Sequence, residues 1–208
     1  RAYVRRVGFQ GKTVTQDEVL RREMRQLEGG WASTAMIEGS KIRLQRLGFF
    51  KEVNVETPTV TGTEDQIDVN YTVEEQPSGS ISATVGFAED TGLILGLSYQ
   101  ESNVFGTGNS INIGVNRSDF QEALSFSFFD PYYTVDGVSR GYSVFFRKSD
   151  FEEFNIASFS TDSYGASVNF GYPISEVSRI GFSFGYESTR IQEGVIPAQE
   201  ISAFIDKE

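Results

Sequence analysis

The chain has 208 residues, with 18 Lys and Arg against 29 Asp and Glu for a net charge of −11, and it contains neither cysteine nor histidine. Their absence excludes disulfides, thiol nucleophiles, histidine bases and the usual zinc and copper sites, so we expect no metal and no other cofactor. Residues 1–78 hold 11 basic and 12 acidic residues, whereas the rest holds 7 and 17, and this acidic second part argues against a nucleic-acid partner, whose phosphates require Lys and Arg.

The chain opens with a strand pattern at Tyr3–Phe9. Because Arg1 already stands at the head of that pattern, we expect no signal peptide and take the chain to be a piece of a longer protein. No run of about 18 apolar residues occurs, so no transmembrane helix is expected.

A first helix is expected to begin at Thr15. Thr15-Gln16-Asp17-Glu18 fits a capping box, in which the Thr15 side chain accepts a hydrogen bond from the Glu18 amide. The pair Gly29-Gly30 ends an apolar stripe at helical spacing, which consists of Val19, Leu20, Met24 and Leu27. The opposite face is either a solvated surface or a docking face, and it carries Arg21, Arg22, Glu23, Arg25 and Glu28. Trp31, directly after this helix, is expected to fill the core.

A second helix is expected from Ser33 or Thr34 to Gly48, and it would bury Ile37, Leu44 and Leu47. Two alternating strands follow, at residues 49–55 and 67–73, with a turn at 61–65 between them. The element order is therefore β-α-α-β-β. It predicts an α+β domain over residues 1–77, with both helices on one face of a three-stranded sheet.

From Gly79 onward the pattern changes to seven stretches of alternating apolar and polar residues, with Ile94 as an exception, at residues 81–87, 93–99, 111–115, 124–128, 142–146, 166–172 and 180–186. One face of each stretch is apolar, and the other is mostly Gly, Ser and Asn, where a soluble β-sandwich commonly carries Lys, Glu and Thr. A Lys or Arg facing lipid costs about 2–4 kcal/mol at the bilayer midplane, and none stands on these apolar faces. Six tyrosines suit an interfacial girdle: Tyr99, Tyr132, Tyr133, Tyr142, Tyr172 and Tyr186. The pattern predicts antiparallel transmembrane barrel strands over residues 78–208.

Turn lengths indicate an orientation for these strands. If the first domain is periplasmic, Glu89–Gly92 and Ser149–Asp162 lie outside, whereas Asn103–Asn109, Pro131–Ser139 and Ile174–Val177 lie inside. Seven strands do not close a conventional bacterial barrel, which has an even number of at least eight. Residues 201–205 have the pattern of the start of an eighth strand. The barrel is expected to be incomplete, and either the chain is truncated or the missing strands come from elsewhere.

Four segments together resemble the BamA family of outer-membrane β-barrel assembly proteins: Leu20–Gln26, Arg46–Phe50, Asn103–Gly108 and Asp130–Val138. The resemblance covers nearly the whole chain. It implies that residues 1–77 are the last POTRA domain, in the periplasm, and that residues 78–208 are the N-terminal part of the barrel in the bacterial outer membrane. It also implies insertase activity without bond chemistry.

The resemblance further implies a lateral gate at the first barrel strand, whose free edge would template nascent outer-membrane proteins by β-augmentation. The gate strand would consist of Ser80, Ile81, Ser82, Ala83, Thr84, Val85, Gly86 and Phe87. Pro77 and Gly79 would form the hinge before it. By the same resemblance, Arg22, Glu23 and Arg25 would dock a lipoprotein similar to BamD, and the strand Ile67–Val73 would offer an edge for peptide addition.

Other functions are weighed against this one. A two-partner secretion transporter of the same superfamily shares POTRA and barrel parts but exports a substrate. A passive porin or adhesin has no role for the first domain. An enzyme is disfavoured, because Glu152-Glu153 fall in an expected loop with no base or nucleophile beside them.

Overall fold

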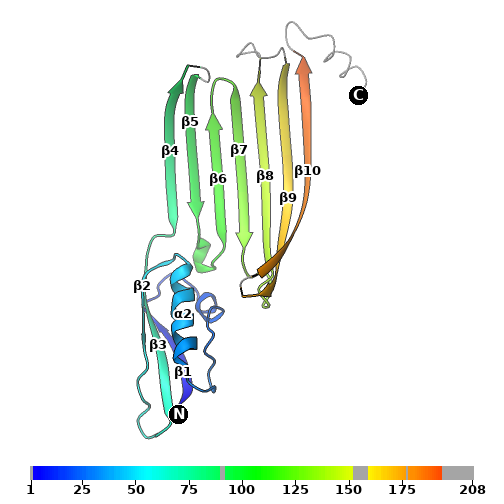
Figure 1. Ribbon diagram of the computed structural model, residues 1–208. Helices are drawn as coiled ribbons and strands as arrows, with labels where there is room; N and C mark the ends of the chain where they lie inside the picture. Colours follow the sequence, from blue (N-terminus) through cyan, green and yellow to red (C-terminus); the bar gives the residue numbers. More distant parts are fainter. Residues whose placement is uncertain (1, 90–91, 152–158, 177, 194–208) are drawn as a thin grey trace. The chain divides into compact units, whose positions relative to one another are not determined.

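The computed structural model describes residues 2–89, 92–151, 159–176 and 178–193 (Figure 1). They form two compact units. The first comprises the chain up to Ser78 together with Ser102–Gly108, and the second comprises Gly79–Glu101 and the chain from Asn109 onward. None of the helices in these described ranges is long and apolar enough to cross a membrane.

The N-terminal unit has the predicted β-α-α-β-β order. Its elements are β1 (Tyr3–Gln10), α1 (Asp17–Arg21), α2 (Thr34–Arg46), β2 (Phe50–Glu56) and β3 (Gln66–Glu75). The sheet order is β1-β3-β2, with β1 parallel and β2 antiparallel to β3. The expectation that residues 67–73 offer a free edge is therefore wrong. The strand from the very start of the chain pairs with β3 and leaves it in the centre of the sheet.

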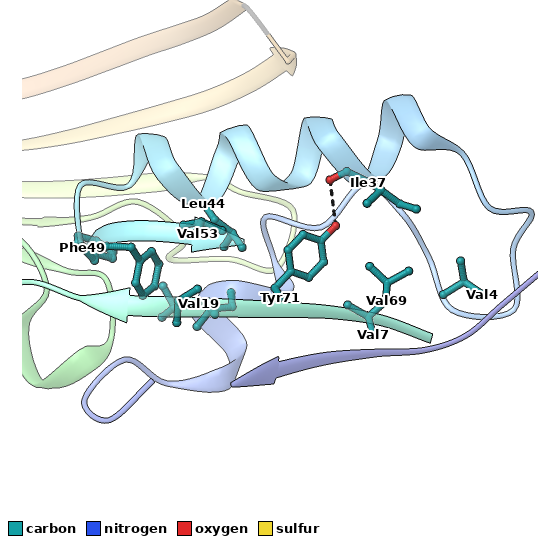
Figure 2. Packing of buried hydrophobic residues seen from close by; sticks show 12 residues of the cluster. Val4, Val7, Val19, Ile37, Leu44, Phe49, Val53, Val69 and Tyr71 are labelled. Carbon is teal, nitrogen blue, oxygen red and sulfur yellow. Dashed lines mark hydrogen bonds between the residues drawn. The ribbon is translucent and has the colours of Figure 1, made fainter. Parts of the chain in front are cut away.

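The second helix is confirmed. The Ser33 hydroxyl accepts from the Met36 amide (3.5 Å) at its start, and Gly48 follows its end with a φ of 76°. Figure 2 shows α2 along one face of the sheet, with Tyr71 reaching from β3 toward it. The buried Tyr71 hydroxyl donates to the Ile37 carbonyl (3.0 Å), so the largest core side chain also ties the sheet to the helix.

The first helix is shorter than predicted, because α1 ends at Arg21. Its N-cap is Gln16, without a side-chain cap, so the capping box at Thr15 is wrong. The Thr15 amide instead donates to Glu75 Oε1 (2.7 Å). At the other end the Arg25 amide donates to the Ser40 hydroxyl of α2 (2.8 Å) rather than to a preceding carbonyl. Long-range partners at both ends thus replace the bonds that a longer helix needs.

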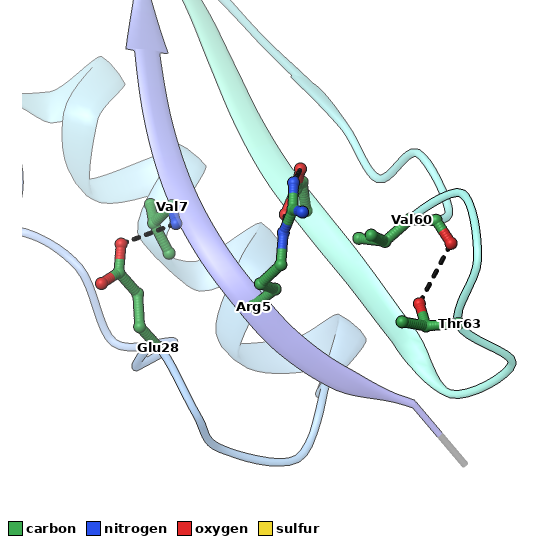
Figure 3. Close-up of polar contacts among 6 residues, drawn as sticks. Arg5, Val7, Glu28, Val60 and Thr63 are labelled. Carbon is green, nitrogen blue, oxygen red and sulfur yellow. Dashed lines mark hydrogen bonds and ion pairs between the residues drawn. The ribbon is translucent and has the colours of Figure 1, made fainter.

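Two apolar residues predicted to be buried lie at the surface. Leu27 is 71% exposed and Trp31 is 53% exposed, with the Trp31 ring 4.2 Å from that of Tyr3. The chain has left the helix before Leu27, so its side chain no longer continues the apolar stripe. Nearby, Figure 3 shows Glu28 accepting from the Val7 amide (2.8 Å) and the Thr63 hydroxyl donating to the Val60 carbonyl.

The second unit is a sheet of seven strands, each antiparallel to the next in chain order, as predicted (Figure 1). The strands are β4 (Gly79–Ala88), β5 (Gly92–Glu101), β6 (Ser110–Arg117), β7 (Gln121–Asp130), β8 (Ser139–Asp150), β9 (Phe159–Ser175) and β10 (Ser178–Glu193). Over the described residues the sheet is not closed, since β4 pairs only with β5 and β10 only with β9. The expected eighth strand at 201–205 lies outside the described residues.

Both described ends of the predicted loop Ser149–Asp162 are strand, whereas its middle, residues 152–158, lies outside the described residues. The strand β8 runs to Asp150 and β9 starts at Phe159, and the Phe151 amide donates to the Phe159 carbonyl (3.2 Å) beyond them. The polar composition of this stretch hid the pairing, because its alternation of apolar and polar residues has already stopped.

Candidate functional site

The two faces of the seven-stranded sheet differ sharply. One row of paired residues crosses all seven strands on the apolar face: Ile81, Tyr99, Ile113, Phe126, Val144, Ala166 and Tyr186. Their side chains are exposed, although such an area of apolar surface is avoided in water. The apolar face is therefore built for a non-aqueous surrounding.

The opposite, polar face has small side chains and hydrogen-bonded pairs. Ser143 and Ser167 hydroxyls lie 2.7 Å apart, and the Ser183 hydroxyl donates to Asn169 Oδ1 (2.6 Å). Phe145 is an exception, and its ring lies over its cross-strand partner Gly165, where an added Cβ would come within 2.6 Å of Phe145 Cε1. The glycine thus makes room for an aromatic ring on an otherwise small-residue face.

At one end of the strands, the apolar face finishes in a row of charged residues of alternating sign. Five paired residues on consecutive strands make this row: Arg117, Glu122, Lys148, Asp162 and Arg190. The Arg117 Nε lies 3.3 Å from Glu122 Oε1. Opposite charges facing each other across strands favour this register.

The other end of the apolar face also carries charge. Asp130 pairs with Arg140, whose guanidinium lies 3.6 Å from the centre of the Tyr133 ring. From Glu122 to Asp130 the strand β7 advances about 26 Å, which at a tilt of about 40° is about 20 Å of bilayer thickness. This height is somewhat less than the apolar band of about 25 Å that outer-membrane barrels present to lipid.

All eight predicted gate residues, Ser80 to Phe87, lie on β4, at one edge of the described sheet. On the apolar face Ile81, Val85 and Phe87 are exposed. Across the described residues β5 is the sole partner of β4, so the backbone along its other side is unpaired there. Within the described part of the chain, that side of β4 is open to the pairing that β-augmentation requires.

The predicted hinge residues stand at the junction of β3 and β4. Pro77 lies between the two strands, and Gly79 is the first residue of β4, paired with Glu101. The preceding Gln76 is held in the N-terminal unit, since its amide donates to the Phe49 carbonyl (2.9 Å). Whether the chain bends at Pro77 and Gly79 stays a prediction.

The predicted docking residues do not share a helix face. Arg22 caps the end of α1, Glu23 lies in the turn beyond it, and Arg25 lies in the irregular chain that follows. The Glu23 side chain is only 7% exposed and lies 2.8 Å from the Arg43 guanidinium of α2, which is 25% exposed. Glu23 is therefore engaged within its own domain, and its charge faces α2.

Glu75 is a residue that the sequence did not single out. Its carboxylate accepts from the amides of Thr13 (2.8 Å), Val14 (2.9 Å) and Thr15 (2.7 Å), and from the Thr13 hydroxyl. Burial raises the pKa of Glu75, but these hydrogen bonds outweigh it and lower the pKa to about 2. A carboxylate that binds three successive amides fixes the chain between β1 and α1 to the end of β3.

Glu75→Gln is expected to destabilise the N-terminal domain by about 1–2 kcal/mol at pH 7, a value reduced for solvent screening. The folded pKa lies below the usual 4.5, so the stabilisation is complete above that pH and is lost as the pH falls toward 2. Thermal unfolding of the domain within the full-length protein, at pH 7 and about pH 3, checks this. Glu74→Gln removes the neighbouring exposed carboxylate paired with Lys51 and serves as control. Equal effects of both changes would contradict the role given to Glu75.

Comparison with known proteins matches both parts of the chain. The POTRA family, described as surface antigen variable number repeat, matches residues 2–76, and the Omp85 superfamily domain matches residues 103–205. Outer membrane protein assembly factor BamA of Neisseria meningitidis serogroup B is 33% identical over 207 residues, which are 99% of this chain and 26% of that protein. The BamA of Buchnera aphidicola is 31% identical over 92% of this chain and 31% of its own length.

Comparison with solved structures gives the same result as comparison with related sequences. The crystal structure of Haemophilus ducreyi BamA lacking POTRA domains 1–3 has a TM-score of 0.79 and 36% identity, over 93% of this chain and 36% of that one. CdiB from Escherichia coli, at 14% identity, shares the fold, with a TM-score of 0.65 over 95% of this chain and 39% of that one.

A POTRA domain followed by a two-faced antiparallel sheet defines the class of POTRA-bearing β-barrel proteins. The chain contains a POTRA-family domain and matches the Omp85 superfamily domain, and its resemblance to BamA is confirmed over nearly its whole length. It spans about a quarter to a third of the length of the curated BamA relatives named above.

Proposed function

We propose that the protein is a core component of the outer-membrane protein assembly machinery and inserts β-barrel proteins through a lateral gate at β4. The observation that carries this proposal is the position of β4 at the edge of the described sheet, where β5 is its sole partner, beside an exposed apolar face. An incoming strand would pair with that edge while its own apolar side chains enter lipid. The relatives named as assembly factors support the same role, which involves no bond chemistry.

The proposed location is the bacterial outer membrane, with residues 1–77 in the periplasm and residues 78–208 in the barrel. The exposed row of apolar side chains across all seven strands supports contact with lipid. The proposed partners are nascent outer-membrane proteins and a lipoprotein similar to BamD, which would bind near Arg22, Glu23 and Arg25. Arg22 and Arg25 are half-buried and Glu23 is buried, so we assign Glu23 the indirect part of holding Arg43 in place.

A photo-crosslinker at Val85 in the full-length protein is expected to capture the terminal strand of a client during its assembly. The same crosslinker at Phe126 is the control, because Phe126 lies on the same face but is flanked by strands on both sides. It is expected to capture lipid alone. Capture of lipid alone at Val85 would contradict the templating mechanism.

Transport of a substrate through the barrel, as in a two-partner secretion transporter of the same superfamily, is the second candidate function. A transported chain would travel along the polar face rather than along the edge of β4. A crosslinker at Ser125, which faces Gly114 and Phe145 on the polar face, distinguishes the two. Strong capture of an extended substrate there, without capture at Val85, would favour export.

A further inference from the structure

The turn between β5 and β6 belongs to the N-terminal unit, although it is separated from that unit in sequence. Residues Ser102–Gly108, named here the 102–108 turn, include a short helical turn at Val104–Gly106. The Gln16 amide donates to the Gly106 carbonyl (2.9 Å), and Gln16 Nε2 donates to the Phe105 carbonyl (3.4 Å). The chain just before α1 thus binds the 102–108 turn through its backbone.

Asn103 joins the two segments from a buried position. Its side-chain Nδ2 donates to the Thr15 hydroxyl (2.9 Å), and its Oδ1 accepts from the Gly108 amide (2.8 Å). The residue is 6% exposed, and a buried amide side chain is favourable only when its polar groups are bonded. The Oδ1 of Asn103 therefore stabilises the 102–108 turn, while its Nδ2 binds the N-terminal chain at Thr15.

Two glycines let the backbones approach closely. Gly106 has a φ of 74°, and a Cβ there would lie 1.9 Å from the Val14 carbonyl oxygen. Gly108 has a φ of 75°, and a Cβ there would lie 2.3 Å from Arg22 Nη2. The left-handed φ strains a side chain at either position, and at Gly106 the Val14 backbone also leaves no room for one, whereas at Gly108 the flexible end of Arg22 would have to move. Directly before Gly106, Phe105 is held at a φ of 51°, a left-handed conformation that a bulky residue adopts only under constraint from its surroundings.

The network continues to the end of β3. Asn103 binds the Thr15 hydroxyl, and the Thr15 amide is bound by Glu75, two residues before Pro77. The Ser102 amide also donates to the Ser78 carbonyl (3.1 Å), one step beyond the last paired residues of β4 and β5, Gly79 and Glu101. The hydrogen bonding between β4 and β5 therefore continues by one bond between Ser78 and Ser102, which both belong to the N-terminal unit.

We propose that the 102–108 turn is an interaction surface by which the N-terminal domain holds the proximal ends of β4 and β5 together, with Asn103 as its positioning residue. The chain leaves this domain at Ser78 and Gly108 and re-enters it at Ser102, so three strand ends are tethered to it. The proposed gate then opens along the edge of β4 that faces away from β5. This inference rests on the proposed gate for its functional meaning, whereas the docking of the turn is testable without any client.

Hydrogen exchange in the full-length protein, in phospholipid nanodiscs, tests the docking. Asn103→Ala leaves the Thr15 hydroxyl and the Gly108 amide without their partner. Exchange in residues 13–16 and 102–108 is expected to become about ten- to a hundredfold faster, with β1 and β3 unchanged. Asn112→Ala, an asparagine removed from the polar face of β6, is the matched control and is expected to change neither segment. Unchanged exchange in Asn103→Ala, or a uniform rise through the whole domain, overturns the proposal.

A disulfide-trapping experiment tests the positioning of the strands. Cysteines at the paired positions Ser80 and Gln100 report the proximal end of β4 and β5, and cysteines at Gly86 and Ile94 report the distal end. In Asn103→Ala the yield of the proximal disulfide is expected to fall severalfold while the distal yield stays the same. Equal yields at both ends in both proteins overturn the role of the 102–108 turn.

Thr15→Val covers the case in which Asn103→Ala does not fold, since it removes only the hydroxyl that Asn103 binds. It is expected to raise exchange in the same two segments by a smaller factor, and no rise overturns the proposal. Client capture at Val85, measured separately, reports on the gate itself. Loss of docking with normal capture would refute the link to the gate and leave the proposed function standing.

Discussion

Phe126→Lys is expected to destabilise the sheet in a bilayer by about 2–4 kcal/mol, whereas Ser127→Lys, one residue along β7, is expected to have little effect. Phe126 lies in the middle of the apolar row, between Ile113 and Val144. Its replacement would place an ammonium group in hydrocarbon. Ser127 faces the other way, between Asn112 and Ser143, where a lysine can reach water.

Denaturant unfolding of the full-length protein from phospholipid vesicles measures both variants against the parent. The comparison is sharp because the two lysines differ only in the face on which they stand. Similar losses of stability for both would mean that the two faces meet the same solvent. That result would refute the assignment of the apolar face to lipid.

The strands of the second unit were predictable because a period of two fixes the face of every residue. All seven predicted stretches lie within observed strands, and their neighbours pair in chain order. The prediction fell short at the far ends of β8, β9 and β10, where charged residues such as Lys148, Asp162 and Arg190 continue the pairing on the apolar face. Backbone pairing persists there after the hydrophobic signal has ended.

The first helix shows why local signals fail. The capping box at Thr15 is a genuine local pattern, but the Thr15 amide and hydroxyl are bound by Glu75 and Asn103, 60 and 88 residues away in sequence. Such partners do not appear in any window along the chain. A long-range partner also accounts for the exposed Trp31. The helix has ended before Arg25, whose amide binds Ser40 of α2, so the segment that carries Trp31 does not follow a longer first helix.

The candidate site was predictable to different degrees. The strand β4 and its place at an edge follow from alternation and chain order, whereas its role as a gate comes from the resemblance to BamA and stays a proposal. The role of Asn103 was harder to predict. An asparagine followed by two glycines within a short segment indicates a turn, but it does not indicate what the turn binds. The position of Glu23 was not predictable from charge pattern, because only the packing of α2 brings Arg43 beside it.

Glu23→Ala is expected to destabilise the N-terminal domain by about 3–5 kcal/mol, because it leaves the half-buried Arg43 guanidinium without its carboxylate. Glu38→Ala, the loss of an exposed acid on α2, is the matched control and is expected to change stability little. Native-state hydrogen exchange of β1, β3 and α2 in the full-length protein measures both changes. Weaker lipoprotein binding in Glu23→Ala would then follow from a loosened domain.

The exchanged pair Glu23→Arg with Arg43→Glu separates the two roles of Glu23. If Glu23 acts by holding Arg43, the exchanged pair is expected to recover part of the lost stability and of the lipoprotein affinity together, since the two charges again face each other. If Glu23 contacts the lipoprotein directly, the exchanged pair recovers stability but not binding, because an arginine then stands where the partner needs a carboxylate. Full stability in Glu23→Ala, with binding lost, would refute the indirect role and return Glu23 to the contact surface.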